Sequence, residues 1–257
     1  MIPKIIHYCW FGGLDKPELA LRCIESWKEK CPDYKIIEWN EQNFDLNCCK
    51  FVADAYKEKK WAFVTDYVRL YAMVNYGGIY MDTDVEVCKS LDSFLENEAF
   101  SGFQTYDSIP TGIMACQKGY PIFEKLLEDY KERCFYKSDG SMDLTPNVEH
   151  ITNEFLKYGL VLNNSKQIVA GFALYPMDYF CAKSFNTGKI NKTENTYTIH
   201  HFAGSWKSDD DKKIRDFEFF CHKYFGLFAK PVFYIYKAVV VYICHPKEII
   251  KRLEKQR

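Results

Sequence analysis

Two aspartates, Asp82 and Asp84, stand one residue apart near the end of residues 61–87, WAFVTDYVRLYAMVNYGGIYMDTDVEV. Alternate residues of an extended strand share a face, so both carboxylates are expected on one face, with Cα atoms roughly 7 Å apart. Two such buried groups repel, so either one takes up a proton or a cation lies between them. Carboxylate oxygens suit Mg2+ or Mn2+. The pair therefore predicts a divalent-metal site.

An Asp-x-Asp pattern alone says little, since residues 209–211 form a second one in a polar run. The residues before Asp82 and Asp84 distinguish this pair from a chance occurrence. Apolar side chains recur at helical spacing from residue 63 to residue 74. Gly77 and Gly78 are expected to end that helix and lead into the strand. The helix carries Asp66 and Arg69 one turn apart, beside Ala62 and Met73 on a face that does not read as solvated. An ordinary surface ion pair is the alternative.

The pattern W-A-x3-D-Y-x-R-x7-G-G-I-Y-x-D-x-D-V resembles the core signature of the DxD-motif sugar transferases. That family includes yeast initiating mannosyltransferases, bacterial capsule and lipopolysaccharide glycosyltransferases and, distantly, the glucosylating domains of large clostridial toxins. Residues 2–13, IPKIIHYCWFGG, resemble the opening of such enzymes, and residues 200–206, HHFAGSW, resemble their closing motif. The three stretches occur in the expected order over most of the chain.

The resemblance implies a role for each residue of the metal and sugar site. Asp84 would hold the ion that bridges the donor phosphates, and Asp82 would contact the ribose or sugar and help to hold that ion. Asp66 and Arg69 would grip hydroxyls of the donor sugar, and the fork of the arginine also suits phosphate. Adjacent histidines of a strand face opposite ways, so only one of the pair 200–201 meets the ion. The resemblance favours His201 and leaves the reverse assignment open.

The resemblance also implies how the nucleotide is held. Trp10 matches an aromatic that stacks on uracil in the toxin relatives, although a strand aromatic is more usually core. Ser205 and Trp206 resemble a flexible closing loop that covers the diphosphate. A UDP-sugar is therefore the preferred donor and GDP-mannose the second. His7 reads as a core histidine.

The expected reaction is transfer with retention of anomeric configuration, explained in the family by attack on the face from which the phosphate leaves. No carboxylate need then lie beneath the sugar, so the carboxylate pair of glycoside hydrolases is not invoked. The acceptor would be a glycan or lipid-linked oligosaccharide of surface polysaccharide synthesis. Residues 144–150, LTPNVEH, lack a Gly-Pro that many relatives have there, which leaves the acceptor side unassigned.

Composition excludes some other classes of protein. The chain has 257 residues, 47% of them hydrophobic, and a net charge of −1, which argues against binding of nucleic acid. Its 11 cysteines are scattered without metal-ligand spacing, which is typical of reduced cytosolic thiols. Residues 1–8 show neither a signal peptide nor an anchor. We therefore expect a bacterial cytoplasmic enzyme, either free in the cytoplasm or peripheral at the cytoplasmic face of the inner membrane.

Strand-like and helix-like stretches alternate, which predicts an α/β fold of GT-A type with a mostly parallel sheet flanked by helices. The expected strands cover residues 4–10, 34–39, 79–87, 99–105, 112–117 and 196–202. The expected helices cover residues 17–30, 44–60, 61–76, 120–135, 142–158 and 209–224, with residues 159–195 irregular. Ligands bind at the carboxyl ends of such strands, so residues 10, 82–84 and 200–201 should converge. The predicted domains are 1–228 and a tail, 229–257.

The tail contains an apolar run, residues 232–244, followed by a mainly basic end. The run is too short to span a bilayer, which needs ~20 residues, and Lys237 interrupts it. It is expected either to pack as a C-terminal helix or, together with the basic residues up to 257, to contact an anionic membrane surface.

Two other functions remain open at this point. Residues 79–85 also match the strand of haloacid-dehalogenase phosphatases, in which Asp82 would be the nucleophile and Asp84 the acid. About 80 residues precede this strand here, whereas those enzymes carry it near the start. The second alternative is a non-catalytic sugar-binding module, against which the intact set of Asp, Arg and His residues argues.

Overall fold

The computed structural model describes residues 1–109, 112–204 and 209–244. The chain forms two compact units, one of residues 1–184 with 190–203 and one of residues 185–189 with 204–257. This division differs from the predicted boundary at residue 228. Helix α7 (Asp209–Tyr224), which we expected in the first domain, is grouped with the C-terminal residues.

The first unit is built on a seven-stranded sheet with the order β2-β1-β3-β6-β5-β8-β7. Strands β6 and β7 run against the other five, which share one direction. The strands are β1 (Ile5–Cys9), β2 (Lys35–Trp39), β3 (Gly78–Met81), β5 (Ala99–Gly102), β6 (Ile113–Cys116), β7 (Gln167–Val169) and β8 (Phe172–Tyr175). The predicted α/β class with a mostly parallel sheet is confirmed.

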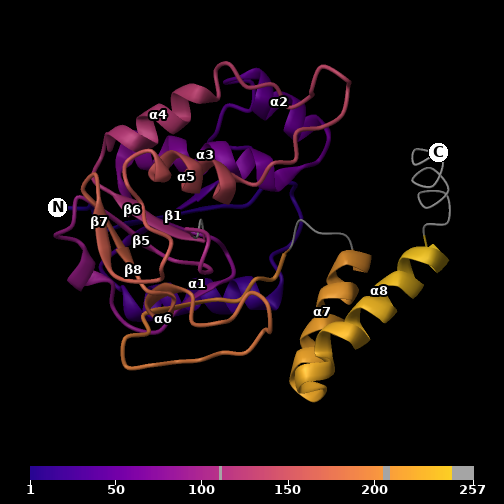
Figure 1. Cartoon of the computed structure of the whole chain (residues 1–257). Helices are drawn as coiled ribbons and strands as arrows, with labels where there is room; N and C mark the ends of the chain where they lie inside the picture. The colour runs from indigo at the N-terminus through magenta and orange to yellow at the C-terminus, as the bar shows by residue number, and fades with distance from the viewer. Residues whose placement is uncertain (110–111, 205–208, 245–257) are drawn as a thin grey trace. The chain divides into compact units, whose positions relative to one another are not determined.

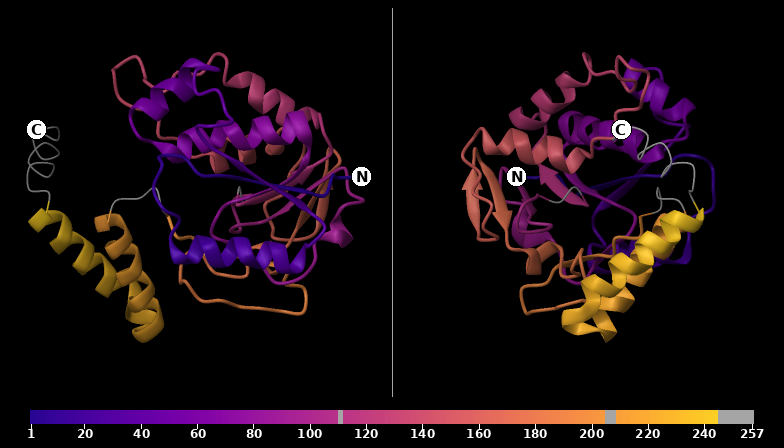
Figure 2. Two further views of the ribbon diagram at one scale, coloured as in Figure 1. Left: turned by 180° about the vertical axis from the view of Figure 1, so that it is seen from behind. Right: turned by 45° about the vertical axis from the view of Figure 1, so that its right-hand side comes forward.

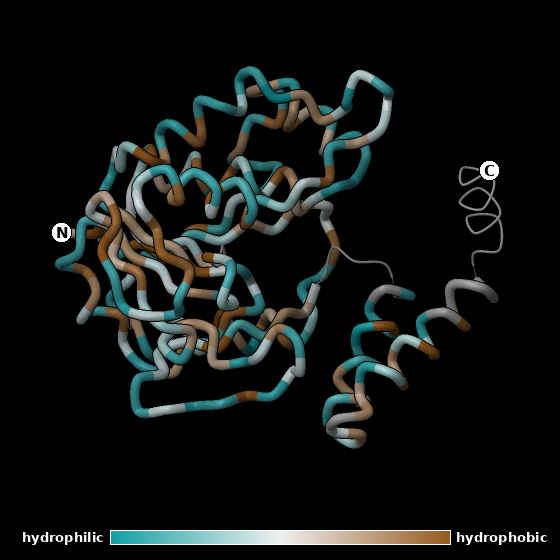
Figure 3. Tube along the Cα trace, viewed as in Figure 1, coloured by the Kyte–Doolittle hydropathy of each residue, from teal (hydrophilic) through white to brown (hydrophobic). Residues whose placement is uncertain are grey.

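Helices cover both faces of this sheet (Figures 1 and 2). On one face lie α2 (Lys50–Lys57), α3 (Trp61–Tyr76), α4 (Pro121–Asp129) and α5 (Asn147–Leu156). On the other lie α1 (Glu18–Lys30) and the short α6 (Met177–Phe180). Each face has its own hydrophobic core, and the strands supply both because successive side chains alternate: Tyr80 packs on the α3 side, and Ile79 and Met81 pack on the α1 side. In Figure 3 the most hydrophobic colours gather on these strands.

The chain leaves the large sheet directly after β3. Strand β4 (Val85–Val87) pairs antiparallel with β9 (Thr198–His200) in a separate two-stranded sheet. The expectation of one strand over residues 79–87 is therefore wrong. A turn, in which the Val85 N–H donates to the Asp82 carbonyl at 3.0 Å, separates the two strands. A short 3-10 helix, Asp92–Phe94, then precedes β5.

Residues 159–195, expected to be irregular, contribute β7, β8 and α6. Strand β8 is four residues long and buried throughout, so it has neither the alternation nor the length that identifies a strand from sequence. The turn before β8 has positive φ at Ala170 (49°) and Gly171 (81°), and Pro176 directly follows β8. The helices expected over 120–135 and 142–158 are shorter, since α4 ends at Asp129 and α5 begins after Pro146.

The second unit is a helical hairpin, in which α7 and α8 (Ala229–Cys244) are joined through a 3-10 turn, Gly226–Phe228. Its small core contains Cys221, Ala229 and Phe233, and the rings of Phe217 and Tyr236 stack with centroids 3.8 Å apart. Among the described residues, no helix combines the length and the apolar character needed to cross a membrane. The basic end of the predicted tail, residues 245–257, lies outside the part of the chain that the structure describes.

Candidate active site

Asp82 and Asp84 lie in the turn between β3 and β4, with partly buried side chains. The Asp82 N–H donates to the carbonyl of Gly112 at 2.7 Å, which ties the turn to the residue before β6. Carboxylate oxygens of both residues and a ring nitrogen of His200 all lie within 4.8 Å of one another. The pair was predicted on one strand face, but it is the turn that brings the two carboxylates together.

His200, and not the expected His201, completes this cluster. Strand β9 is paired so that His200 lies opposite Val85, and its Nε2 is 3.4 Å from Asp84 Oδ1 and 3.9 Å from Asp82 Oδ2. His201 follows it on the opposite side, and its ring nitrogen Nε2 is 2.8 Å from Glu86 Oε2. The preference for His201 is therefore corrected, because adjacent residues of an extended strand face opposite ways.

The electrostatics of the cluster show how it is balanced in the absence of a cation. Burial alone would raise the pKa of Asp84, but the His200 imidazolium and the Ala203 N–H, 2.6 Å from Oδ2, lower that pKa to about 2. Burial opposes the charge on His200, yet the Asp84 carboxylate raises the pKa of His200 well above its ordinary value. Two carboxylates and one imidazole are a suitable donor set for Mn2+ or Mg2+, which would take the place of the proton.

Arg69 connects Asp82 to helix α3. Its Nη2 is 3.2 Å from Asp82 Oδ1 and 3.4 Å from Asp66 Oδ1, and its guanidinium lies 4.7 Å from the centre of the Tyr80 ring. The Tyr80 hydroxyl also donates to Asp82 Oδ1 at 2.9 Å. Arg69 is only 5% exposed, so Asp66 and Arg69 form a buried network and not a surface ion pair. The network fixes one oxygen of Asp82 and leaves the other facing His200.

The same network shifts the pKa of its members. Burial raises the pKa of Asp66 to about 6, although Arg69 acts in the opposite direction. Burial disfavours the charge on Arg69, but the nearby carboxylate of Asp82 keeps the pKa of Arg69 above its usual value. Burial thus moves the pKa of the Asp66 carboxyl group toward neutral pH.

Trp10 directly follows β1, which runs parallel to β3, so the two chain segments reach the same edge of the sheet. Its ring is partly buried, its Nε1 donates to the Leu14 carbonyl at 2.6 Å, and Lys16 Nζ lies 5.6 Å from the ring centre. The prediction was that residues 10, 82–84 and 200–201 converge; this topology brings residue 10 and residues 82–84 to one edge of the sheet, and of the two histidines His200 lies beside the aspartates. Ser205 and Trp206 lie outside the described residues.

His7 has the core role that the sequence suggested. Trp39 Nε1 donates to its Nδ1 at 3.1 Å, and its Nε2 is 2.9 Å from the Gly77 carbonyl oxygen. Burial lowers the pKa of His7 to about 4, so the ring is neutral and its Nε2 carries the proton that it donates to Gly77.

Two residues of the site were not singled out from the sequence. Tyr80 could have been found, because strand alternation places it on the same side as Asp82. Gly112 could not: a Cβ there would lie 2.6 Å from His200 Nδ1, a contact between segments 88 residues apart that leaves no local pattern.

Comparison with known proteins supports the resemblance. Residues 17–101 match the family described as "Glycosyltransferase sugar-binding region containing DXD motif". Inositol phosphoceramide mannosyltransferase 3 of Schizosaccharomyces pombe is 28% identical over 52% of this chain and 38% of its own length. Mannosyl phosphorylinositol ceramide synthase SUR1 of Saccharomyces cerevisiae is 30% identical over 51% of this chain and 35% of its own length. The chain thus spans less than two fifths of either relative.

Solved structures also align with this chain. One is a glycosyltransferase involved in the glycosylation of the major capsid of PBCV-1, with 14% identity, a TM-score of 0.48 and coverage of 83% of this chain and 98% of the other. The family match covers the segment that holds Asp66, Arg69, Asp82 and Asp84.

Proposed function

We infer that this chain, which carries the glycosyltransferase sugar-binding region with its DXD motif in residues 17–101, transfers a sugar from a nucleotide-sugar donor with the help of a divalent cation. The observation that carries this inference is the cluster of Asp82, Asp84 and His200 beside the buried Arg69. Carboxylates and an imidazole at one edge of an α/β sheet are what a diphosphate-bound cation requires.

Each residue of the site then has a distinct task. Asp84 and His200 would hold the cation, and Asp82 would share it while Arg69 and Tyr80 keep its other oxygen in place. A bound Mn2+ or Mg2+ supplies neutralisation of charge on the leaving nucleoside diphosphate. Asp66 and Arg69 would contact the donor sugar, and Trp10 the base. Ser205 and Trp206 would cover the diphosphate.

Two lines of support bear on the donor and the stereochemistry. The names of the yeast relatives contain mannose, which favours GDP-mannose, whereas the resemblance of Trp10 to a uracil-stacking aromatic favours a UDP-sugar.

Retention follows if the acceptor attacks from the side of the leaving phosphate. Asp66 is engaged by Arg69, so no carboxylate of this network is assigned as a nucleophile.

The acceptor is proposed to be a glycan or a lipid-linked oligosaccharide of surface polysaccharide synthesis, and the ceramide in the relatives' names supports a lipid-linked one. The helical hairpin of α7 and α8 offers a means of reaching such an acceptor. Phe228, Tyr234 and Ile235 are 71%, 63% and 68% exposed, and Lys230 and Lys237 lie among them. Exposed aromatic and aliphatic groups with interspersed cations favour reversible contact with an anionic membrane surface, from the cytoplasmic side.

The phosphatase alternative is less well supported by the geometry. A nucleophilic Asp82 would need an oxygen free to attack, but Oδ1 accepts from both Arg69 and Tyr80, and Oδ2 is directed toward His200. A non-catalytic sugar-binding module would not require the charged network around Arg69, but it remains an outcome of the test below.

The test is thermal unfolding of the full chain with UDP-sugars and GDP-mannose, each with and without Mn2+, followed by assay of donor hydrolysis. A ligand that binds only the folded state raises stability by RT ln(1 + [L]/Kd). We expect a Mn2+-dependent shift for at least one donor, lost in Asp84→Asn. Asp210→Asn, in the exposed second Asp-x-Asp stretch, is the matched control and should keep the shift. Binding without turnover of any donor would support the binding module, and release of phosphate from simple esters the phosphatase.

A further inference from the structure

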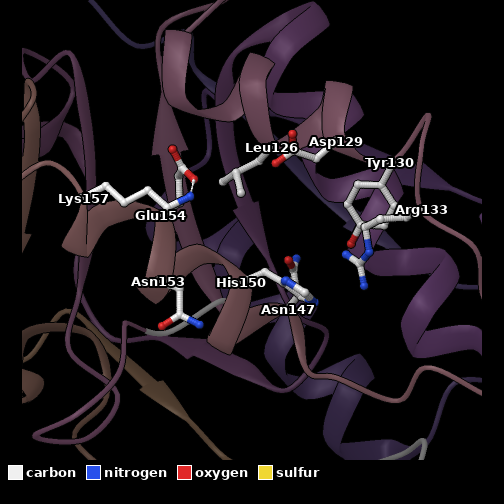
Figure 4. A pocket seen from close by; sticks show the side chains of 9 residues that line it. All are labelled: Leu126, Asp129, Tyr130, Arg133, Asn147, His150, Asn153, Glu154 and Lys157. Carbon is white, nitrogen blue, oxygen red and sulfur yellow. Dashed lines mark hydrogen bonds and ion pairs between the residues drawn. The ribbon is translucent and has the colours of Figure 1, made fainter. Parts of the chain in front are cut away.

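A cavity of about 140 Å3 lies between the end of α4 and one face of α5 in the first unit (Figure 4). Tyr130 and Arg133 line it from the α4 side, and Asn147, His150 and Lys157 line it from α5. Its size is close to that of an engineered cavity, about 150 Å3, that accommodates benzene. The volume therefore fits one six-membered ring and not a chain of them.

Two buried polar atoms in this cavity have no hydrogen-bond partner among the residues that the structure describes. They are Asn147 Oδ1 and His150 Nε2, and Asn147 is only 4% exposed. Buried polar groups are costly to leave unsatisfied, so each one requires an explanation. Both residues line the same cavity, and a polar molecule bound there is a source of the missing hydrogen bonds once the two side chains turn toward it.

One residue of the cavity lining is hydrogen-bonded to a residue of the candidate active site. Asn147 Nδ2 donates to the backbone carbonyl of Asp66 at 3.4 Å, and the Asp66 carboxylate is paired with Arg69. On the opposite wall, Arg133 is held by the rings of Phe51 and Tyr130, whose centres are 4.8 and 4.5 Å away. A molecule in the cavity would thus lie one residue away from the group proposed to hold the donor sugar.

The lining combines hydrogen-bond donors and acceptors. Arg133 and Lys157 donate, while Asp129 and the amide oxygen of Asn147 accept. Burial, and secondly Arg133, lowers the pKa of His150, so its ring is neutral and one nitrogen accepts while the other donates. Hydroxyl groups, which both donate and accept, match donors and acceptors of this lining alike.

A phosphate would suit the lining less well. Asp129 and Glu154 carboxylates also line the cavity, and Arg133 already faces Asp143 Oδ2 at 3.4 Å. Lys157 is likewise engaged, at 2.7 Å from Glu154. The cations are therefore balanced by carboxylates, which favours a neutral polyol over an anion.

We propose that the cavity between α4 and α5 binds one sugar ring of the acceptor, with Asn147 and His150 recognising its hydroxyl groups. This inference rests on the proposed function, because it takes the neighbouring Asp66 and Arg69 as the donor side. Asn147 would then link the two subsites through its hydrogen bond to Asp66.

The experiment measures binding of three probes to the full chain by saturation-transfer NMR: methyl α-D-mannopyranoside, methyl β-D-galactopyranoside and myo-inositol. We expect at least one probe to bind, and His150→Ala to weaken that binding at least fivefold. Asn153→Trp should have the same effect by filling the cavity from its exposed rim without removing a buried group. Leu156→Trp, on the same helix, partly exposed and outside the cavity lining, is the matched control and should bind as the wild type does.

The outcome is separable from that of the proposed function, because Mn2+-dependent binding of the nucleotide sugar is measured on the same variants. If the donor binds normally but no probe binds, or if Asn153→Trp leaves probe binding unchanged, the acceptor assignment is overturned and the donor site stands. If no donor binds to the wild type, the proposed function itself fails. Loss of probe binding in Asn153→Trp with unchanged donor binding supports the inference.

Discussion

Adding one methyl group at Gly112 should weaken the proposed cation site without removing any of the residues assigned to it. The Cβ of an alanine there would lie 2.6 Å from His200 Nδ1 and 2.7 Å from Cε1, whereas ordinary contacts begin at 3.4 Å. The imidazole must therefore move by about 0.8 Å, the difference between those distances. Nε2 would move with it, away from the position 3.4 Å from Asp84 Oδ1.

The magnitude follows from what such displacements cost elsewhere. Misplacement of a functional group by about 1 Å costs on the order of 100-fold in rate, and loss of the groups that orient metal ligands costs about 10–100-fold in affinity. We expect Gly112→Ala to weaken Mn2+ binding by about 10–100-fold, or ~1.4–2.7 kcal/mol. Overpacking alone would lower the free energy of unfolding by about 1–3 kcal/mol, so folding is verified by circular dichroism.

The assay is calorimetric titration of Mn2+ in the presence of the donor identified above, on a double-mutant cycle with His200→Ala. If Gly112 acts only through the ring of His200, Gly112→Ala should have no further effect once that ring is removed. Additive losses in the double variant would refute this reasoning, because the methyl group would then act through the backbone of the Asp82 turn. Wild-type Mn2+ affinity in a folded Gly112→Ala would refute the placement of His200 in the site.

Three further predictions concern the buried network and the helical hairpin. Arg69→Lys keeps the charge but loses the planar guanidinium, which lies over the Tyr80 ring and whose Nη2 reaches both Asp66 and Asp82, so kcat/KM should fall at least tenfold; a smaller loss would return Arg69 to a purely structural role. Asp66 has a pKa of about 6 when folded against 3.8 as its ordinary value, so its contribution to stability falls as pH rises from about 4 to 6. Asp66→Asn should therefore raise the free energy of unfolding at pH 7 by up to about 3 kcal/mol and have no such effect at pH 4, as measured by denaturant titration. A variant that is less stable than the wild type at pH 7 would contradict the raised pKa of Asp66. Substitution of Phe228 and Ile235 by Ser should reduce co-sedimentation with anionic vesicles several-fold at unchanged thermal stability; equal sedimentation on neutral vesicles or at high salt would argue against an electrostatic contribution.

The parts of the molecule that could be predicted from sequence are those formed by one continuous segment of the chain. Local spacing predicts helix α3, the two glycines that end it and strand β3. It therefore also predicts that Asp66 and Arg69 lie on the helix and that Asp82 lies at the end of the strand. The site lies where α3 begins and β3 ends because the two run in opposite directions, and this antiparallel return is a local property of the segment.

The parts that were missed depend on contacts between distant segments. The choice of His200 over His201 is set by the register of β9 against β4, which no residue near position 200 reveals. The break between β3 and β4 likewise depends on the pairing of β4 with the distant strand β9. Strand β8 is a short apolar run whose type only its neighbour in the sheet determines.

The break after β3 also explains why two carboxylates can be held close together here. A continuous strand would separate their Cα atoms by roughly 7 Å and direct both side chains the same way, into one environment. In the observed turn the two differ: Asp82 accepts from Arg69 and Tyr80 in the α3 network, while Asp84 accepts from the Ala203 N–H and pairs with His200. Each carboxylate thus has a cationic partner of its own, Arg69 for Asp82 and His200 for Asp84. The fold thereby directs Asp82 Oδ2 and Asp84 Oδ1 toward the same nitrogen of His200, which is where a divalent cation would be held.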